Sequence, residues 1–135
     1  MLKQTGRVID SLAVMQTSVQ LAPQDAGAQS NLGVTLQELG RLDEAEASYN
    51  QAIALEPDYA EAYYNLGITL TDLGRLDEAL VSCRQAIALK PDYAGAHCHL
   101  GDILFKKGHH REGLNEKLIG AGAISFDVNN GLSIL

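Results

Sequence analysis

The chain has 135 residues, of which 46% are hydrophobic and 20% charged, and its mean hydropathy is −0.05. This composition is typical of one soluble globular domain. The net charge of −7 argues against a nucleic-acid partner, because binding to a phosphate backbone requires a basic surface. No apolar run approaches the roughly 18 residues that span a bilayer, and Asp10 interrupts the apolar stretch near the N-terminus. Two cysteines cannot form a disulfide framework, so we expect a cytoplasmic protein without a membrane anchor or signal peptide.

A 34-residue repeat dominates the sequence. Pro23, Pro57 and Pro91 are spaced by 34 residues, and residues 26–59 align without gaps on residues 60–93 with 23 identical positions. Identity at this level means that the two segments form the same structural unit. The function therefore has to be interpreted on that unit.

Each unit contains two stretches with the apolar spacing of an α-helix. In the second unit the first stretch ends at Gly74, a typical helix stop, and the second ends before Pro91. Helices of about a dozen residues are marginal in isolation. We therefore expect packing between neighbouring units to supply most of the stability.

Acidic residues near the helix starts are expected to act as caps. Asp77 is placed to cap the second helix of its unit, and Asp92 the helix that follows. Asp58 and Glu61 have the spacing of a capping box. Glu61 therefore has two interpretations, a helix cap and a contact with a basic peptide residue, of which we favour the cap.

The phase of the repeat divides the chain into five segments. They are residues 1–25, the second helix of an incomplete repeat; 26–59 and 60–93, two complete repeats; 94–120, a degenerate repeat; and 121–135, a tail. In the degenerate repeat Gly113 and Gly120 stand where the other units have alanine, which predicts a short, weakened second helix.

The two ends of the chain depart from the repeat. Residues 124–135 alternate apolar and polar side chains around Asn129-Asn130-Gly131, which predicts a C-terminal β-hairpin. At the other end, the helix of the incomplete repeat has no first helix to cover its apolar residues, which are Val8, Leu12, Met15 and Val19. Because two strands alone are marginal in water and an uncovered apolar face attracts a partner, a homodimer through either end is an interpretation that the sequence leaves open.

The pattern resembles the tetratricopeptide repeat, a 34-residue helix–turn–helix family. The matching residues are Leu32-Gly33, Ala45, Ala52 and Pro57 in the first complete unit and Leu66-Gly67, Ala79, Ala86 and Pro91 in the second. Tyr63 stands where the family often has Trp, and Gln29 and His97 are weaker occupants of that position. The resemblance implies an all-α, right-handed superhelical solenoid of antiparallel helix pairs, with the first helices lining a concave groove.

The groove expected from this resemblance is polar, mildly acidic and provided with a few apolar anchors. Its predicted residues are Ser30, Asn31, Val34, Gln37, Glu38, Glu61, Tyr64, Asn65, Ile68, Thr71, Asp72, Cys98, His99, Asp102 and Lys106. Such a surface suits an extended peptide. The family's carboxylate clamp, which uses Lys at the fifth position of the repeat, is absent, because Ser30, Tyr64 and Cys98 stand there.

Asn31 and Asn65 occupy the sixth position of their units, and His99 follows in the third. This row is most similar to the repeats of O-linked N-acetylglucosamine transferases, whose asparagines hold a peptide backbone, and an amide can both donate and accept a hydrogen bond. The other interpretation is that asparagine simply suits an exposed helix surface. We weigh the two equally.

No catalytic, metal or cofactor site is predicted. His97 and His99 are two residues apart on a helix, so they point to different faces and cannot chelate one ion. His109 lies at the next turn, roughly 15 Å along the helix axis. Cys83 takes a core position of the repeat, and Cys98 has no evident helper base.

The sequence therefore favours a non-catalytic protein-interaction module that binds an extended segment of another protein. Two alternatives remain. One is that the chain is a substrate-recruiting fragment of a larger enzyme such as a glycosyltransferase, methyltransferase or sulfotransferase, and the other is that it is a self-assembling structural unit.

Overall fold

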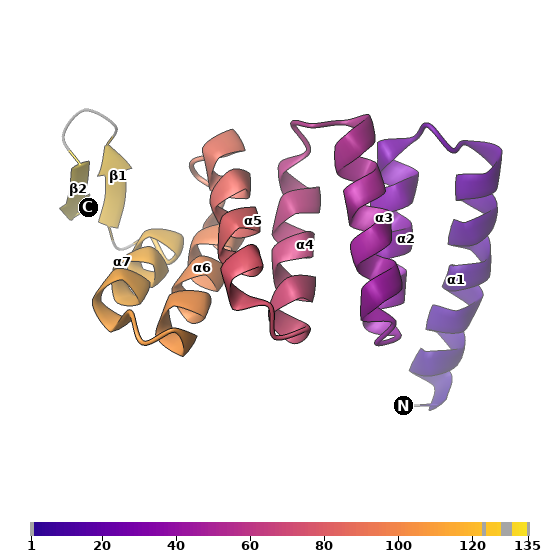
Figure 1. The fold of residues 1–135 in the computed structure, drawn as a ribbon, viewed down its shortest axis with the longest axis horizontal. Coiled ribbons are helices and arrows are strands. Elements are labelled where there is room, and N and C mark those ends of the chain that lie inside the picture. Colours follow the sequence, from indigo (N-terminus) through magenta and orange to yellow (C-terminus); the bar gives the residue numbers. More distant parts are fainter. Residues whose placement is uncertain (1, 123, 128–130, 135) are drawn as a thin grey trace.

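The structure is a computed structural model that describes the backbone of residues 2–122, 124–127 and 131–134 and the side chains of residues 6–122. Within this part of the chain, seven helices follow one another and are succeeded by two short strands (Figure 1). The elements are α1 Leu2–Leu21, α2 Ala26–Glu38, α3 Leu42–Leu55, α4 Ala60–Asp72, α5 Leu76–Leu89, α6 Ala94–Lys106, α7 His110–Gly120, β1 Ile124–Asp127 and β2 Gly131–Ile134. The helical part is a solenoid of paired helices, as predicted.

The helices pack in pairs that stack along the chain. The closest pairs are α2 with α3, α4 with α5 and α6 with α7, and each pair rests on the next through the second helix of one and the first helix of the other. The sharp turns inside the pairs depend on glycine, since Gly40, Gly74 and Gly108 all have φ between 76° and 85°. The core runs through all pairs and includes Leu36, Tyr49, Leu66, Leu70, Cys83, Leu100, Ile103 and Leu104.

Small residues let the paired helices approach closely, as the repeat pattern requires. A methyl group on Gly33 would lie 2.6 Å from the ring of Tyr49, and one on Gly67 would lie 2.6 Å from Sγ of Cys83. The third pair is the tightest at the backbone. A methyl group on Gly113 would lie 2.9 Å from the carbonyl oxygen of Gly101. Gly113 thus allows a closer approach of α6 and α7, even though α7 is short.

The predicted caps at Asp58, Asp77 and Asp92 are wrong. Asp25, which is not among the predicted caps, does cap α2, because its Oδ1 accepts a hydrogen bond of 3.2 Å from the Ala28 amide. In contrast, α4 begins after Tyr59 and α5 after Arg75, and neither cap residue makes a side-chain hydrogen bond to its helix. Arg75, the cap of α5, lies two residues before Asp77, so Asp77 stands inside the first turn instead of at the cap.

The same correction applies to Asp58 and Asp92. Asp58 lies one residue before the cap of α4 and Asp92 one residue before Tyr93, the cap of α6. Carboxylates inside the first turn still interact favourably with the positive end of a helix, as Asp77 does in α5. The predicted capping box of Asp58 and Glu61 does not form, and Glu61 stands exposed in the first turn of α4.

The first helix packs against α2 alone. Leu12 reaches the core with 9% of its surface exposed, while Val8, Met15 and Val19 are half-buried. At the position of Met15, the next two pairs have Tyr49 and Cys83, both with 0% exposed surface. One side of α1 is therefore covered less than the matching sides of α3 and α5.

After α7 the backbone of β1 runs antiparallel to β2, with Ile124 opposite Ile134 and Asp127 opposite Gly131. The predicted turn at Asn129-Asn130 lies outside the described residues.

Candidate functional site

The predicted groove is built on α2, α4 and α6, which lie next to one another along the solenoid. Corresponding positions of the repeat therefore come from neighbouring helices and form rows across the three. Asn31, Asn65 and His99 form one such row, and Glu38, Asp72 and Lys106 form another at the helix ends. We call this surface the groove below.

Gln37 joins the first two helix pairs below this surface. Its Oε1 accepts a hydrogen bond of 2.8 Å from the Tyr49 hydroxyl of α3, and it lies 3.3 Å from the Thr69 hydroxyl of α4. Burial raises the pKa of Tyr49, and the carboxylate of Glu38 adds to this effect. The hydroxyl thus stays protonated and donates. Gln37 consequently holds α2 in register with α4 and does not present its oxygen to a ligand.

His99 is tied to the neighbouring helix through Thr71. The Thr71 hydroxyl donates to the Gly67 carbonyl oxygen at 2.8 Å, so Oγ1 of Thr71 is left to accept from Nε2 of His99, 3.0 Å away. This arrangement places the single proton of neutral His99 on Nε2 and leaves Nδ1 as an acceptor. Burial lowers the pKa of His99, against an opposing effect of Asp102, so the neutral form is favoured near pH 7.

An aromatic cluster stands beside His99. The ring of Tyr64 lies 5.0 Å from that of Tyr93 and meets the His99 ring edge-on at 6.3 Å. Gly95 makes room for it, since a methyl group there would lie 3.2 Å from the Tyr64 ring. Burial raises the pKa of Tyr93 to about 12, with Glu61 contributing, so the cluster is uncharged at neutral pH.

In the third unit a residue of α7 pairs with a groove residue of α6. Lys117 of α7 forms an ion pair with Asp102 of α6, and its ammonium lies 5.9 Å from the centre of the Phe105 ring. Lys106 is exposed at the end of α6. The charge of Asp102 is therefore neutralised within the protein, whereas Lys106 remains open to solvent.

The structure corrects the predicted groove at the fifth position of the repeat. Ser30 is buried with 4% of its surface exposed. Cys98 packs on α7, because a methyl group on Gly120 would lie 2.5 Å from its Sγ. This position faces the second helix of its own unit, and only a long side chain such as Tyr64 reaches beyond it. Thr71 is also buried, with 8% exposed surface, under His99.

Cys98, although packed on α7, is half-buried, and the other predicted residues also keep some accessible surface. Asn31, Glu38, Glu61, Asp72 and Lys106 are exposed, and Val34, Gln37, Tyr64, Asn65, Ile68, His99 and Asp102 are half-buried. The groove thus offers amide, carboxylate and aromatic groups around two aliphatic side chains.

His97 has a structural role that was not predicted from the sequence. It is 5% exposed, with Nδ1 2.7 Å from the Glu116 carboxylate of α7 and Nε2 2.7 Å from the Pro91 carbonyl oxygen. It fastens α7 and the preceding loop to α6. Glu116 takes the position of Ser82, whose hydroxyl donates to the Tyr63 carbonyl oxygen at 2.7 Å. That substitution is the signal that could have revealed the pair.

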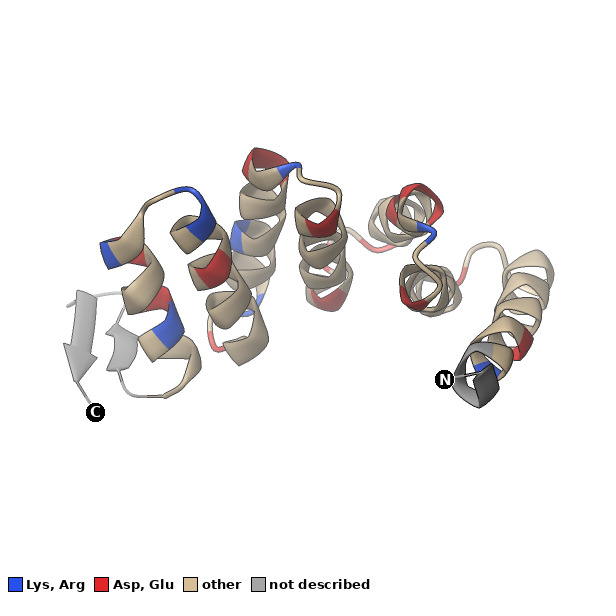
Figure 2. Cartoon of the chain, turned by 90° about the horizontal axis from the view of Figure 1, so that it is seen from below, with Lys and Arg blue, Asp and Glu red and all other residues tan. Residues whose placement is uncertain are grey.

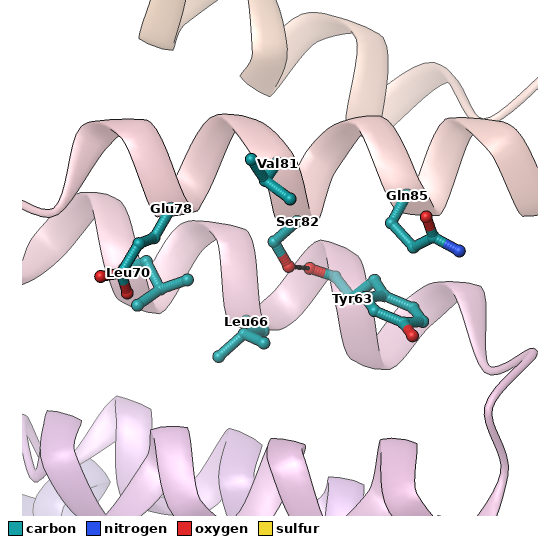
Figure 3. Close-up of a pocket in the computed structure, with 7 residues that line it drawn as sticks. All are labelled: Tyr63, Leu66, Leu70, Glu78, Val81, Ser82 and Gln85. Carbon is teal, nitrogen blue, oxygen red and sulfur yellow. Dashed lines mark hydrogen bonds between the residues drawn. The ribbon is translucent and has the colours of Figure 1, made fainter.

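A second, shallow hollow of about 280 Å³ lies between α4 and α5 (Figure 3). It is lined by Tyr63, Leu66, Leu70, Glu78, Val81, Ser82 and Gln85. Its surface is mainly apolar, and its one charged side chain, Glu78, is paired with Arg75. None of these residues belongs to the groove. A polar hollow of about 310 Å³ at the start of α4 contains Glu61 together with Glu56, Asp58, Tyr59, Ala60 and Lys90.

Within the described part of the chain, no group of three His, Cys, Asp or Glu residues is arranged to hold a metal ion. Cys83 is completely buried, and burial raises the pKa of its thiol to about 12, which suits a core residue. None of the helices in the described residues is long and apolar enough to cross a membrane.

A sequence profile of the tetratricopeptide repeat matches residues 2–52 and 30–94. The chain belongs to the tetratricopeptide repeat family. Members of this family bind protein partners, and the chain is accordingly a protein-interaction module. No curated protein sequence matches this tetratricopeptide repeat chain.

Solved structures with a similar fold include several of MamA. Two structures of MamA have TM-scores of 0.80 and 0.79 at 26% identity, over 89% of this chain and 70% and 66% of theirs. MamA from Desulfovibrio magneticus RS-1 has a TM-score of 0.79 at 22% identity, over 90% of this chain and 68% of its own, which shows the common fold alone. The present chain thus spans about two thirds of these relatives.

Proposed function

We propose that this tetratricopeptide repeat chain binds an extended segment of another protein in the groove of α2, α4 and α6. The observation that supports this best is the row of hydrogen-bonding groups at equivalent positions of three neighbouring helices. Asn31 is exposed, Asn65 is half-buried, and Nδ1 of His99 is left as an acceptor by the Thr71 contact. Amides and an imidazole acceptor can bind backbone groups without reading side chains.

The surroundings of this row fit a peptide better than a small molecule. Val34 and Ile68 are half-buried aliphatic side chains on the same helices, and Tyr64 provides an aromatic face next to His99. Apolar anchors next to paired donors and acceptors are what a bound extended chain requires, since its side chains alternate in direction.

A random twelve-residue peptide library displayed on phage tests the proposal. We expect the chain to select peptides whose binding is lost when Asn31 and Asn65 are both changed to alanine. The matched control is Asn50→Ala, an exposed asparagine on α3 outside the groove, which should leave binding unchanged. Amide chemical shifts of the labelled chain should move on α2, α4 and α6 when a selected peptide is added. Selected peptides that bind both variants equally would refute the groove as the binding surface.

Self-association is a second candidate, supported by the open side of α1. Met15 is half-buried where the corresponding residues of α3 and α5 are fully buried, and Ile9 and Val14 are 54% and 60% exposed. Light scattering over a range of concentrations should find a dimer that Met15→Glu dissociates. The control Gln16→Glu, which adds the same charge at the exposed neighbouring residue, should leave the dimer intact. A monomer at every concentration would refute this candidate.

A further inference from the structure

The net negative charge of the chain comes from its two central units. Residues 26–89 contain ten Asp and Glu against three Lys and Arg, a net charge of −7, which equals that of the whole chain. Figure 2 shows mainly acidic residues on the middle helices, whereas acidic and basic residues occur together on α6 and α7. The groove crosses from the acidic units into the more basic third unit, so its electrostatic potential changes along its length.

The row at the helix ends carries this change in charge. Glu38 is the last residue of α2, Asp72 the last of α4 and Lys106 the last of α6. The C-terminal end of a helix is its negative end, so a lysine there is favourable and a carboxylate is unfavourable. Helix stability would thus favour a base in all three units, but the first two have an acid at this position.

The protein does not neutralise these two carboxylates. Among the side chains described for residues 6–122, no ion pair involves Glu38 or Asp72, and both are exposed. The arginines of the following turns are committed elsewhere, Arg41 to Glu44 and Arg75 to Glu46 and Glu78. By contrast, Lys117 neutralises the groove carboxylate of Asp102. Negative charge is therefore kept open at the edge of the groove.

We propose that the segment bound in the groove is basic where it crosses α2 and α4, with Lys or Arg side chains meeting Glu38 and Asp72. This inference rests on the proposed function. The axes of α2 and α4, which both pack mainly on α3, are at least as far apart as the roughly 8–10 Å of a directly packed pair. An extended chain advances about 3.3 Å per residue, so the two basic side chains are at least about three residues apart. An acidic residue at least about three positions further on would meet Lys106 on α6.

The phage-displayed twelve-residue library tests this specificity. Peptides selected by the wild-type chain should be enriched in Lys and Arg at a spacing of at least about three residues. Changing Glu38 to Gln and Asp72 to Asn together should weaken the selected peptides about fivefold or more at 50 mM NaCl, as expected for two exposed ion pairs. The loss should shrink at 500 mM NaCl because salt screens these pairs.

The control variant is Asp10→Asn with Asp43→Asn. It changes the net charge by the same amount at exposed positions on α1 and α3 and should bind as the wild type does. Circular dichroism should show that both double variants remain folded. Peptides that depend on Asn31 and Asn65 but show no basic excess would overturn this inference and leave the proposed function standing. If no peptide depends on the two asparagines, both fail.

Discussion

The eighth residue of each complete unit is a glycine that faces a side chain of different size in each pair. Gly33 faces Tyr49, Gly67 faces Cys83 and Gly101 faces Lys117. At this contact the first helix of each unit always has glycine, whereas the residue opposite on the second helix differs from unit to unit. The glycine accepts whichever partner stands opposite, because its own volume is minimal.

Gly67→Ala should destabilise the chain, and Cys83→Ala should restore part of the loss. The added methyl group would lie 2.6 Å from Sγ of Cys83, while the next atoms are 3.5 Å or more away. Overpacking of this kind costs about 1–3 kcal/mol. Urea unfolding of the two single variants and the double variant measures the coupling. If the loss in Gly67→Ala is undiminished in the Cys83→Ala background, the sulfur is not the obstacle.

Buried thiol and phenol groups should make the chain sensitive to base. Burial raises the pKa of Cys83 from 9.0 to about 12 and that of Tyr93 from 10.0 to about 12. In the unfolded chain these groups ionise earlier, so stability is complete below about pH 9 and is lost as the pH rises toward 12. Cys83 contributes at most about 1.4 kcal/mol per pH unit, and the half-buried Tyr93 contributes less because solvent screens its charge.

Cys83→Ala isolates one of these contributions. Urea unfolding between pH 8 and 10.5 should show stability falling less steeply in Cys83→Ala than in the wild type, whatever the stability of the variant at pH 8. Identical slopes in the wild type and Cys83→Ala would contradict a buried, protonated thiol.

At the scale of the element, α7 depends on a polar contact that the other second helices do not have. Buried His97 joins Glu116 of α7 and the Pro91 carbonyl oxygen, each at 2.7 Å. Removing the buried imidazole deletes both contacts and leaves a cavity beside α7. The contact offsets the short length of α7, which has 11 residues.

His97→Ala should therefore loosen α7 more than the rest of the chain. Amide hydrogen exchange should accelerate in α7 by about tenfold or more, which corresponds to a loss of at least about 1.4 kcal/mol, while α4 and α5 keep their protection. His109→Ala at an exposed neighbouring position is the control, because its contact to Glu112 is 3.9 Å and half-exposed. Uniform acceleration over all helices would instead show a global destabilisation.

How far the elements could be predicted follows from what fixes each of them. The helix pairs follow from apolar spacing and from Gly74 and its equivalents, since a turn with positive φ needs glycine. The helix starts do not follow, because a cap is decided by a single hydrogen bond, and Asp58 stands one residue before the cap position of α4 while Asp77 stands two residues after that of α5. Local sequence constrains periodicity better than it constrains the first residue of a helix.

The candidate site shows the same division. The resemblance to the tetratricopeptide repeat predicts that α2, α4 and α6 line the groove, and the structure places these helices in successive units. The sequence could not show that Ser30 is buried or that Cys98 faces α7, since both depend on how far the paired helices approach. The bond between Thr71 and His99 joins residues 28 positions apart and depends on the angle between two units, which no local pattern contains.

At the scale of the whole molecule, charge is distributed unevenly along a solenoid whose units contact only their neighbours. Residues 26–89 account for the entire net charge of −7, and each of the described helix pairs contacts only the neighbouring pairs. Repulsion among these carboxylates acts between helices about 10 Å apart, which is close to the Debye length at 0.1 M salt. In a solenoid the stability is a sum over units and their interfaces, so this repulsion directly lowers the stability of the central units.

Salt should therefore stabilise the chain. Raising NaCl from 20 to 500 mM screens the repulsion, and it also weakens the exposed pairs Arg41–Glu44 and Arg75–Glu46. Exposed pairs contribute little each, so relief of repulsion should prevail by about 1 kcal/mol, or about 3–4 °C in the midpoint of thermal unfolding. Circular dichroism at 222 nm measures the midpoint. Asp72→Asn should start from a higher midpoint and gain less from salt, because it removes one uncompensated carboxylate at the end of α4. A midpoint that falls with added NaCl would mean that the ion pairs outweigh the repulsion and that the open carboxylates do not cost the fold anything.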